Sequence, residues 1–276
     1  MGTGVEEVRR WWRTRLVETG PGVVRVRGYP VEELIGQIRW AGLVWLVVRG
    51  ELPTEWEERL LEAGLVAGVD HGPMAPSIAV ARMVATCGTS LGAAVAAGMC
   101  AIGDVHGGAA EQCMELLYEV AEKKRQGFER AEAVGRVLER RGVGRVPGYG
   151  HRIHRGADPR AVRLCALVEQ QVREGRLSGE FLEIGREIEA RLETLKGRRV
   201  PMNVDGALAV ALCELGFQPV VGKALFILSR CVGVVAHALE QLLQGERLKG
   251  PVPPDVGYAY EGPPLRHYAA PGVGSG

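Results

Sequence analysis

Between Met83 and Gly103 the chain carries no charged residue over 21 positions. A segment of this length either crosses a membrane or lies in the interior of a folded domain. Ala, Gly, Ser and Thr dominate it, and these residues gain little free energy on transfer into lipid. Gly-Thr-Ser at 88–90 is typical of a helix end followed by a helix start. We therefore expect two buried helices that pack closely through small side chains, and no membrane span.

The composition is that of a globular protein. Hydrophobic residues make up 46% of the 276 residues and charged residues 24%, which suits one large domain or two modest ones. The net charge of +1 disfavours a nucleic-acid binder and an acidic disordered chain. Six cysteines form no CxxC pair, and the first 20 residues lack the apolar core of a signal sequence. These features favour a cytoplasmic protein with free thiols.

Helical periodicity runs along most of the chain, and the fold class that it predicts is all-α. Helices are expected at 32–49, 109–124, 129–141, 158–174, 179–195 and 204–215. The apolar segment 218–244 contains Gly222 and Gly233, which predicts two helices. Val23–Val26 is the best strand signal.

Residues 123–160 hold eleven Lys or Arg against four Asp or Glu. Within them, Gly142–Gly156 is dense in Gly, Arg and His. A basic segment of this kind fits a polyanion, either the phosphates of a nucleotide-like cofactor or nucleic acid. The alternative is a solvated basic face of a helix, which needs no ligand.

Three of the histidines lie beside glycines, where a backbone or a ligand can come close. They are His71 in Val-Asp-His-Gly-Pro, His106 in His-Gly-Gly-Ala and His151 in Pro-Gly-Tyr-Gly-His. His154 lies three residues from His151, but no third ligand at suitable spacing supports a metal site. His237 lies in an apolar helical stretch and is expected to be a packed helix residue.

Asp205 precedes an apolar helix in Asn-Val-Asp-Gly, and two interpretations fit it. A carboxylate at such a position caps a helix N-terminus, which is worth about 1 kcal/mol. It can also act as a general base. The residues alone favour the cap.

Eight short motifs resemble, in order and approximate spacing, the citrate synthase superfamily, and within it the short citryl-CoA lyases and the lyase module of ATP-citrate lyase. They are Val24-Arg25-Val26-Arg27-Gly28-Tyr29-Pro30-Val31-Glu32-Glu33-Leu34, Gly50-Glu51-Leu52-Pro53-Thr54, Asp70-His71-Gly72-Pro73, His106-Gly107-Gly108-Ala109, Pro147-Gly148-Tyr149-Gly150-His151-Arg152, Asp158-Pro159-Arg160, Asn203-Val204-Asp205-Gly206 and Ser229-Arg230. No single motif is decisive, but eight in order are highly specific.

The resemblance covers residues 23–250 and implies an all-α homodimer with a citrate synthase-like fold. It implies a large helical domain at about 23–108 and 203–250, and a smaller mobile domain at about 109–202. Residues 1–22 are then an N-terminal extension, and residues 251–276 are a Pro/Gly-rich tail. The apolar helices at 77–103 are candidates for the dimer interface.

The resemblance also implies roles for particular residues. The catalytic triad matches His106, His151 and Asp205. The positions that bind oxaloacetate or citrate match His71, Arg160 and Arg230. The loop that receives coenzyme A matches Val146, Pro147, Gly148, Tyr149 and Gly150, and Arg155 is expected to contact a phosphate of coenzyme A. Neither a metal nor a bound redox cofactor is implied.

The expected chemistry makes or breaks a C–C bond through an enolate of acetyl-CoA. A carboxylate at Asp205 moves the methyl proton, and a neutral His106 donates a hydrogen bond to the thioester oxygen. His151 handles the proton of the citryl hydroxyl. Cleavage of citryl-CoA to acetyl-CoA and oxaloacetate uses the same three residues as citrate synthesis.

Two features favour citryl-CoA lyase: the short chain, and Gly-Pro after His71, where synthases usually carry an acidic residue. Synthases often have an Arg-Pro near the C-terminus, where this chain reads Lys-Gly-Pro at 249–251. Either Arg247 or Lys249 takes the role of that Arg, or one carboxylate contact is missing. ATP-citrate lyase lacks a His at the His106 position, which this chain keeps.

Citrate synthase therefore stays as the alternative, and a non-catalytic subunit that binds coenzyme A or citrate as a distant one. A separate citryl-CoA synthetase is a candidate partner of a lyase. Neither nucleic acid nor a membrane is an expected partner.

Overall fold

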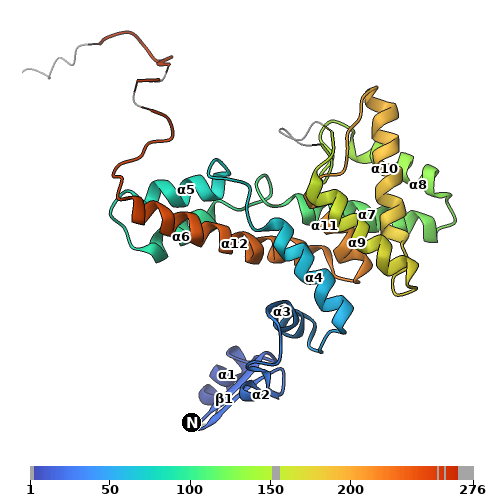
Figure 1. Ribbon diagram of the computed structural model, residues 1–276, viewed down its shortest axis with the longest axis horizontal. Helices are drawn as coiled ribbons and strands as arrows, with labels where there is room; N and C mark the ends of the chain where they lie inside the picture. Colours follow the sequence, from blue (N-terminus) through green and yellow to red (C-terminus); the bar gives the residue numbers. More distant parts are fainter. Residues whose placement is uncertain (1–2, 151–155, 254, 258, 267–276) are drawn as a thin grey trace, which may run out of the picture.

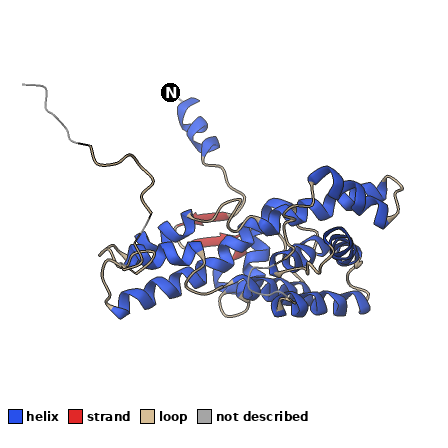
Figure 2. Cartoon of the chain, turned by 90° about the horizontal axis from the view of Figure 1, so that it is seen from above, coloured by secondary structure: helices blue, strands red, loops and turns tan. Residues whose placement is uncertain are grey.

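The computed structural model describes residues 3–150, 156–253, 255–257 and 259–266. Most of these residues lie in helices (Figures 1 and 2). One end of the molecule in Figure 1 consists of α5, α6 and much of α12, and the other consists of α7 to α11. The N-terminal segment lies below this body, and the described part of the C-terminal tail extends away from it.

The helices are α1 (Thr3–Trp11), α2 (Val31–Leu34), α3 (Trp40–Arg49), α4 (Glu55–Gly68), α5 (Pro76–Ala85), α6 (Leu91–Cys100), α7 (Ala109–Arg125), α8 (Arg130–Arg141), α9 (Pro159–Arg173), α10 (Glu180–Lys196), α11 (Val204–Glu214) and α12 (Pro219–Gln244). The strands are β1 (Val17–Gly20), β2 (Val23–Val26) and β3 (Tyr29–Pro30). The helices predicted from 109 to 215 are confirmed, with ends that differ by at most one residue.

The small antiparallel sheet makes the fold mostly helical rather than strictly all-α. Its order is β1-β2-β3, so the predicted strand is at its centre, and Val17 pairs with Val26. Arg27 in the following turn has a φ of 51°. Its guanidinium donates a 2.6 Å hydrogen bond to the carbonyl oxygen of Val47 in α3. This bond ties the sheet to the helical body.

The single helix predicted at 32–49 is wrong, because the backbone turns between α2 and α3. Ile35 is extended after α2, and Gly36 has a φ of 80°, a left-handed conformation that suits glycine. Arg39 is also extended, and α3 begins after it. The spacing of apolar residues in this segment is helical throughout, so it did not predict the break between α2 and α3.

The uncharged segment folds into the last turn of α5 and all of α6, two closely packed helices as expected, but α6 is not a buried helix, because only Ala94 and Gly98 in it are buried. The two helices pack on each other and on α12. Gly98 shows how close they are, since a Cβ there would lie 2.7 Å from the carbonyl oxygen of Ser77 and 2.9 Å from Ala81 Cβ. Small side chains are therefore required where these helices meet.

The two helices predicted at 218–244 are one continuous helix, α12. Gly222 and Gly233 do not interrupt it, because their missing side chains let other elements approach. A Cβ on Gly222 would lie 2.7 Å from Met114 Sδ. A Cβ on Gly233 would collide with the carbonyl oxygen of Val69, just after α4. These glycines serve packing rather than helix termination.

Among the described residues, α12 alone is long and apolar enough to cross a membrane by length and composition. It packs against α4, α5, α6 and α7, and 39% of its most apolar window is buried. A core helix passes the same composition test, so this result is weak evidence for a membrane span.

The main core joins α3 and α4 to α7–α11. Trp45 and Phe217 meet edge to face, with ring centroids 5.0 Å apart. The guanidinium of Arg49 lies over both rings and donates to the carbonyl oxygen of Gly216, just after α11. All residues from Gly206 to Cys213 are buried, so α11 is a fixed central element.

We predict opposite effects for two glycine substitutions in helices. Gly233→Ala should lower the free energy of unfolding by about 1–3 kcal/mol, because the new methyl group meets a backbone carbonyl. Gly135→Ala in α8 is the control, since the nearest atom to its Cβ would be 3.9 Å away. This variant should gain about 0.5–1 kcal/mol. Urea unfolding of both variants measures the difference; equal effects would contradict the packing role of Gly233.

Candidate active site

His106 lies in the loop between α6 and α7, and its ring is held by the start of α5. Its Nε2 accepts a hydrogen bond from the backbone N–H of Ser77, at 3.2 Å, and lies 3.0 Å from Ser77 Oγ. A nitrogen that accepts from a backbone N–H carries no proton, so the neutral ring has its proton on Nδ1. His106 therefore keeps Nδ1–H as a donor for another group.

Two effects keep this ring neutral. Burial lowers the pKa of His106, and the positive charge of Arg230 lowers it further. The N-terminus of α5, which faces Nε2, disfavours a positive ring in the same way. A neutral imidazole can donate a hydrogen bond to an oxygen that gains negative charge.

Asp205 is the second residue of α11, but it does not cap this helix. The cap is Asn203, whose side-chain oxygen accepts from the N–H groups of Asp205 and Gly206, at 3.0 and 3.2 Å. The residues alone favoured Asp205 as the cap, and this interpretation is wrong. The Asp205 carboxyl does not cap α11. Burial raises its pKa, although the positive charges of Arg160 and Arg230 oppose the shift. A carboxyl group with a raised pKa is suited to proton transfer.

The predicted coenzyme A loop, 146–150, lies directly against the start of α11. A Cβ on Gly148 would lie 2.8 Å from the Cα of Gly206, so the two backbones touch. The carbonyl oxygen of Gly148 accepts from the N–H of Asn203, at 2.9 Å. The Asn203 side chain donates to the carbonyl oxygen of Gly150, at 2.8 Å. Two motifs that are more than 50 residues apart in the sequence therefore form one unit.

The same loop is anchored in the core by its side chains. Val146 and Tyr149 are buried. Pro147 lies between Val146 and Gly148, the residue whose backbone touches Gly206. The Tyr149 hydroxyl donates to the carbonyl oxygen of Gly185 in α10, at 3.0 Å. The backbone of the loop is thus held rigidly, which suits recognition of a ligand by backbone groups.

Arg160 is held by Asp158, which is 1% exposed. The two carboxylate oxygens accept from Nε and Nη2 of Arg160, at 3.1 and 2.9 Å. Asp158 also caps α9 through the N–H of Arg160 and accepts from the N–H of Val204 at the start of α11, at 3.2 Å. One carboxylate therefore fixes a candidate substrate-binding Arg relative to the helix that carries Asp205. In the sequence, Asp158 was only one member of the Asp-Pro-Arg motif. Its role in holding Arg160 and the start of α11 became apparent only from the tertiary structure.

Arg230 is the positive centre of the site. It is 4% exposed, and its Nε donates to the carbonyl oxygen of Gly68 at the end of α4, at 3.1 Å. His106, Asp205 and Arg160 all lie close enough to interact with its charge. The structure therefore brings three other predicted site residues within electrostatic range of one buried guanidinium.

The other predicted residues are distributed as follows. His71 is exposed in the turn after α4, beside Asp70, whose charge also acts on Arg230. His151 and Arg155, like His154, lie outside the described residues. The roles of all these residues stay predictions.

The basic excess at 123–160 is largely neutralised on the helix surfaces. The ion pairs are Lys124–Glu180, Arg125–Glu122, Arg130–Glu183, Arg136–Glu132, Arg140–Glu119, Arg141–Glu119 and Arg160–Asp158. This pairing favours the solvated-face interpretation for the helical part of the segment, and leaves its loop as the candidate for phosphate contacts.

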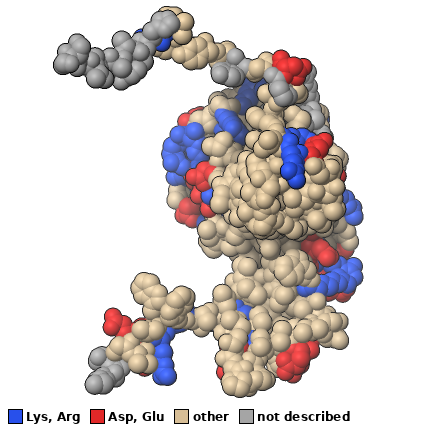
Figure 3. Space-filling model, turned by 90° about the vertical axis from the view of Figure 1, so that its left-hand side faces the viewer, with Lys and Arg blue, Asp and Glu red and all other residues tan. Residues whose placement is uncertain are grey.

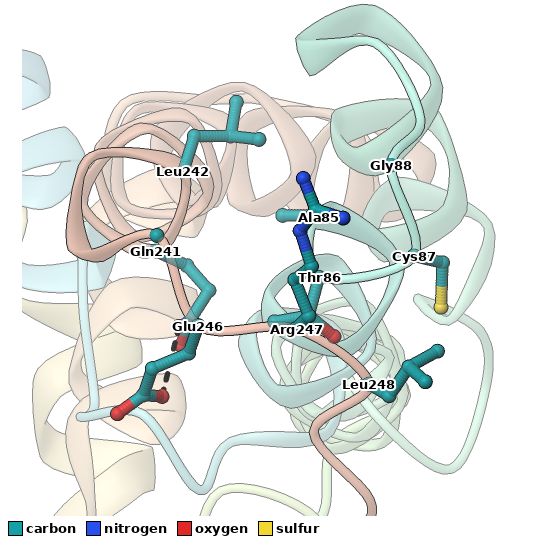
Figure 4. Close-up of a pocket in the computed structure, with 10 residues that line it drawn as sticks. Ala85, Thr86, Cys87, Gly88, Gln241, Leu242, Glu246, Arg247 and Leu248 are labelled. Carbon is teal, nitrogen blue, oxygen red and sulfur yellow. Dashed lines mark hydrogen bonds between the residues drawn. The ribbon is translucent and has the colours of Figure 1, made fainter.

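A pocket of about 480 Å³ lies at the other end of α12, away from this site (Figure 4). It is formed between the C-terminal ends of α5 and α12 and the segment Gly245–Leu248. Arg247, one of the two candidates for the C-terminal substrate Arg, lines it. The N–H of Leu248 donates to the carbonyl oxygen of Thr86, at 3.1 Å, and holds this segment on α5.

The helical fold and the arrangement of these residues agree with the protein family that a sequence comparison identifies. The sequence model of the family described as citrate synthase, C-terminal domain, matches residues 53–251. The chain belongs to the citrate synthase family.

Individual relatives extend this result. The chain is 36% identical to the citryl-CoA lyase of Hydrogenobacter thermophilus, with a TM-score of 0.83 over 94% of this chain and 97% of that one. It is 26% identical to the citrate synthase of Thermoplasma acidophilum, with a TM-score of 0.66 over 83% and 58% of the two chains. That synthase was solved with carboxymethyl coenzyme A and oxaloacetate.

Among curated sequences, the citrate synthase of Saccharolobus solfataricus is 26% identical over 211 residues, which are 76% of this chain and 54% of that relative. The chain spans about half the length of the curated relatives it matches.

The Asp158 clamp generates a prediction for stability. Burial alone would raise the pKa of the Asp158 carboxyl, but the hydrogen bonds and charge of Arg160 and the N–H of Val204 hold it below its usual value. Asp158→Asn should lower the free energy of unfolding at pH 7 by about 1–3 kcal/mol, because it weakens a buried hydrogen-bonded pair.

The pH dependence of this loss follows from the direction of the shift. A lowered folded-state pKa stabilises the fold above the unfolded value of about 3.9, and this contribution disappears as the pH falls through the folded-state pKa. The gap between wild type and Asp158→Asn should therefore shrink below about pH 4. Glu55→Gln is the control, since the pair Glu55–Arg59 is exposed and should contribute less than about 1 kcal/mol. Urea unfolding at pH 7 and below about pH 4 measures the difference in the free energy of unfolding between wild type and variant. A difference that does not change with pH would contradict the stabilising role of the Asp158–Arg160 pair.

Proposed function

We propose that this protein is a citryl-CoA lyase, which cleaves citryl-CoA to acetyl-CoA and oxaloacetate. The observation that carries the proposal is the match to the citryl-CoA lyase of Hydrogenobacter thermophilus, which covers 94% of this chain and 97% of that one. The citrate synthase matches instead leave almost half of the relative uncovered. The Gly-Pro after His71 supports the same choice.

The residues fit a cleavage through an enolate. His151 accepts the proton of the citryl hydroxyl as the C–C bond breaks, and the electron pair of that bond passes to the acetyl-CoA enolate. The Nδ1–H of His106 donates to the thioester oxygen as negative charge gathers there. Asp205, whose raised pKa favours the protonated carboxyl, returns a proton to the methyl carbon.

The two arginines hold the carboxylates of the substrate. Arg160 is presented by Asp158 and Arg230 by the end of α4, so both guanidinium groups are oriented before the substrate arrives. Such orientation lowers the entropic cost of reaching the transition state. The loop 146–150, which is held by α10 and the start of α11, and Arg155 receive coenzyme A.

We propose a cytoplasmic homodimer as the working state. The end of the molecule that carries α5, α6 and α12 shows a broad surface without charged side chains (Figure 3). On α12, Val232, Leu239 and Leu243 are 58%, 44% and 79% exposed. Apolar side chains gathered on one helix face are typical of an interface.

The second candidate is citrate synthase, which condenses acetyl-CoA with oxaloacetate and hydrolyses the thioester. The curated relatives with this name favour it, and it needs the same catalytic residues. The two activities differ in whether water reaches the thioester.

A paired assay of the purified protein distinguishes them. With citryl-CoA, we expect rapid formation of acetyl-CoA and oxaloacetate. With acetyl-CoA and oxaloacetate, we expect little release of the free coenzyme A thiol. Steady thiol release with citrate formation would make the protein a synthase. Activity in neither direction would favour a non-catalytic subunit or a different pair of substrates.

Substitution of Asp205 separates an enzyme from a binding subunit. Asp205→Asn should lower turnover of citryl-CoA by about 10²-fold or more, because the amide cannot return the proton. The Asn203 cap does not use the Asp205 side chain, so the variant should fold. Calorimetric titration with coenzyme A is the control and should give an affinity close to that of wild type. Full biological activity of the variant would contradict a catalytic role.

A further inference from the structure

One face of α12 holds the C-terminal end of α4 over two turns. Ser229 donates to the carbonyl oxygen of Leu65, and Arg230 donates to that of Gly68. Gly233 packs against the carbonyl oxygen of Val69. The next side chain on this face is that of His237, whose Nε2 lies 3.0 Å from Asp70 Oδ2. Residues at spacings of three or four share a helix face, so this row continues from the buried arginine to His237.

His237 is therefore not simply a packed helix residue, as its apolar surroundings in the sequence indicated. On the side away from Asp70, its Nδ1 lies 3.2 Å from Nη1 of Arg82 in α5. A guanidinium can only donate, so Nδ1 is an acceptor and the ring proton is on Nε2. The ring then donates to Asp70.

Arg82 is held in this place by α12 itself. Its Nη1 also donates to Glu240 and its Nη2 to Gln244, at 3.1 Å, and the Arg82 side chain is only 11% exposed. Glu240 also lies near the ring, with its Oε2 3.8 Å from Nδ1 of His237. Three elements, α5, α12 and the turn after α4, therefore meet at one imidazole.

Asp70 uses its other oxygen to shape the turn that carries His71. Oδ1 accepts from the backbone N–H groups of His71 and Gly72, at 2.6 and 2.9 Å. The carboxylate of Asp70 thus determines the backbone position of a candidate substrate residue, and its charge acts on Arg230. Whatever holds Asp70 therefore also holds the His71 turn and keeps this negative charge near Arg230.

We propose that His237, with its tautomer set by Arg82, is a positioning residue for the substrate end of the site. Through Asp70 it holds the turn that carries His71, and it keeps the Asp70 carboxylate where its charge acts on the buried Arg230. This inference rests on the proposed function for its effect on turnover, but the hydrogen-bond chain itself does not depend on the activity.

The kinetic test compares two substitutions at the same position. His237→Gln keeps an acceptor for Arg82 and a donor for Asp70, whereas His237→Leu keeps neither. In the citryl-CoA cleavage assay, His237→Leu should raise KM about tenfold or more and change kcat less than about threefold, because ground-state and transition-state binding are lost together. His237→Gln should stay within about threefold of wild type in both values. An unchanged KM in His237→Leu, or equal damage in the two variants, would overturn the proposal.

Two measurements keep the test valid if the wild type does not cleave citryl-CoA. Long-range ¹⁵N–¹H spectra of protein labelled at histidine should show Nε2 of His237 as the nitrogen that carries the proton and Nδ1 as the acceptor. Hydrogen exchange of the peptide that contains His71 and Gly72 should be faster in His237→Leu and unchanged in His237→Gln. A ring protonated on Nδ1, or exchange that is the same in both variants, would overturn the proposal independently of the activity.

Discussion

The backbone contact between Gly148 and Gly206 is the constraint on which the site depends. A side chain at either position would collide with the other segment, so only glycine allows the loop and the helix to touch. Asn203 then bonds both ways, capping α11 and holding the loop through Gly148 and Gly150. The proposed coenzyme A loop and the proposed catalytic carboxyl are thereby held at a fixed separation.

Charge is the second organising feature, and the structure limits its cost by pairing. Arg230 is buried, but it lies near the carboxylates of Asp70 and Asp205 and donates to a backbone carbonyl. Asp158 compensates Arg160 in the same way. Burial, and then the positive charge of Arg230, lowers the pKa of His106, while burial raises the pKa of the Asp205 carboxyl. One hydrogen-bond donor and one proton donor thus coexist a short distance from two arginines.

Much of the fold could be predicted from local patterns. Amphipathic periodicity located α7 to α11, and Gly-Thr-Ser at 88–90 correctly separated α5 from α6. The errors in the predicted helices came at glycines, because a glycine can either end a helix or allow another element to pack against it. Gly36 turns the backbone and ends a helical pattern, whereas Gly222 and Gly233 lie within one continuous helix because another element packs against them. Only the neighbour in space distinguishes these cases.

The sequence by itself determined the helical class, the order of the motifs and the residue types available for chemistry, because periodicity and short motifs are local properties. The tertiary structure decided which of these groups meet and where their protons lie. Ser77 places the proton of His106 on Nδ1, Arg82 places that of His237 on Nε2, and Asn203 frees Asp205 from capping. Each of these assignments depends on a partner's position and hydrogen-bonding geometry, which the residue type alone does not specify.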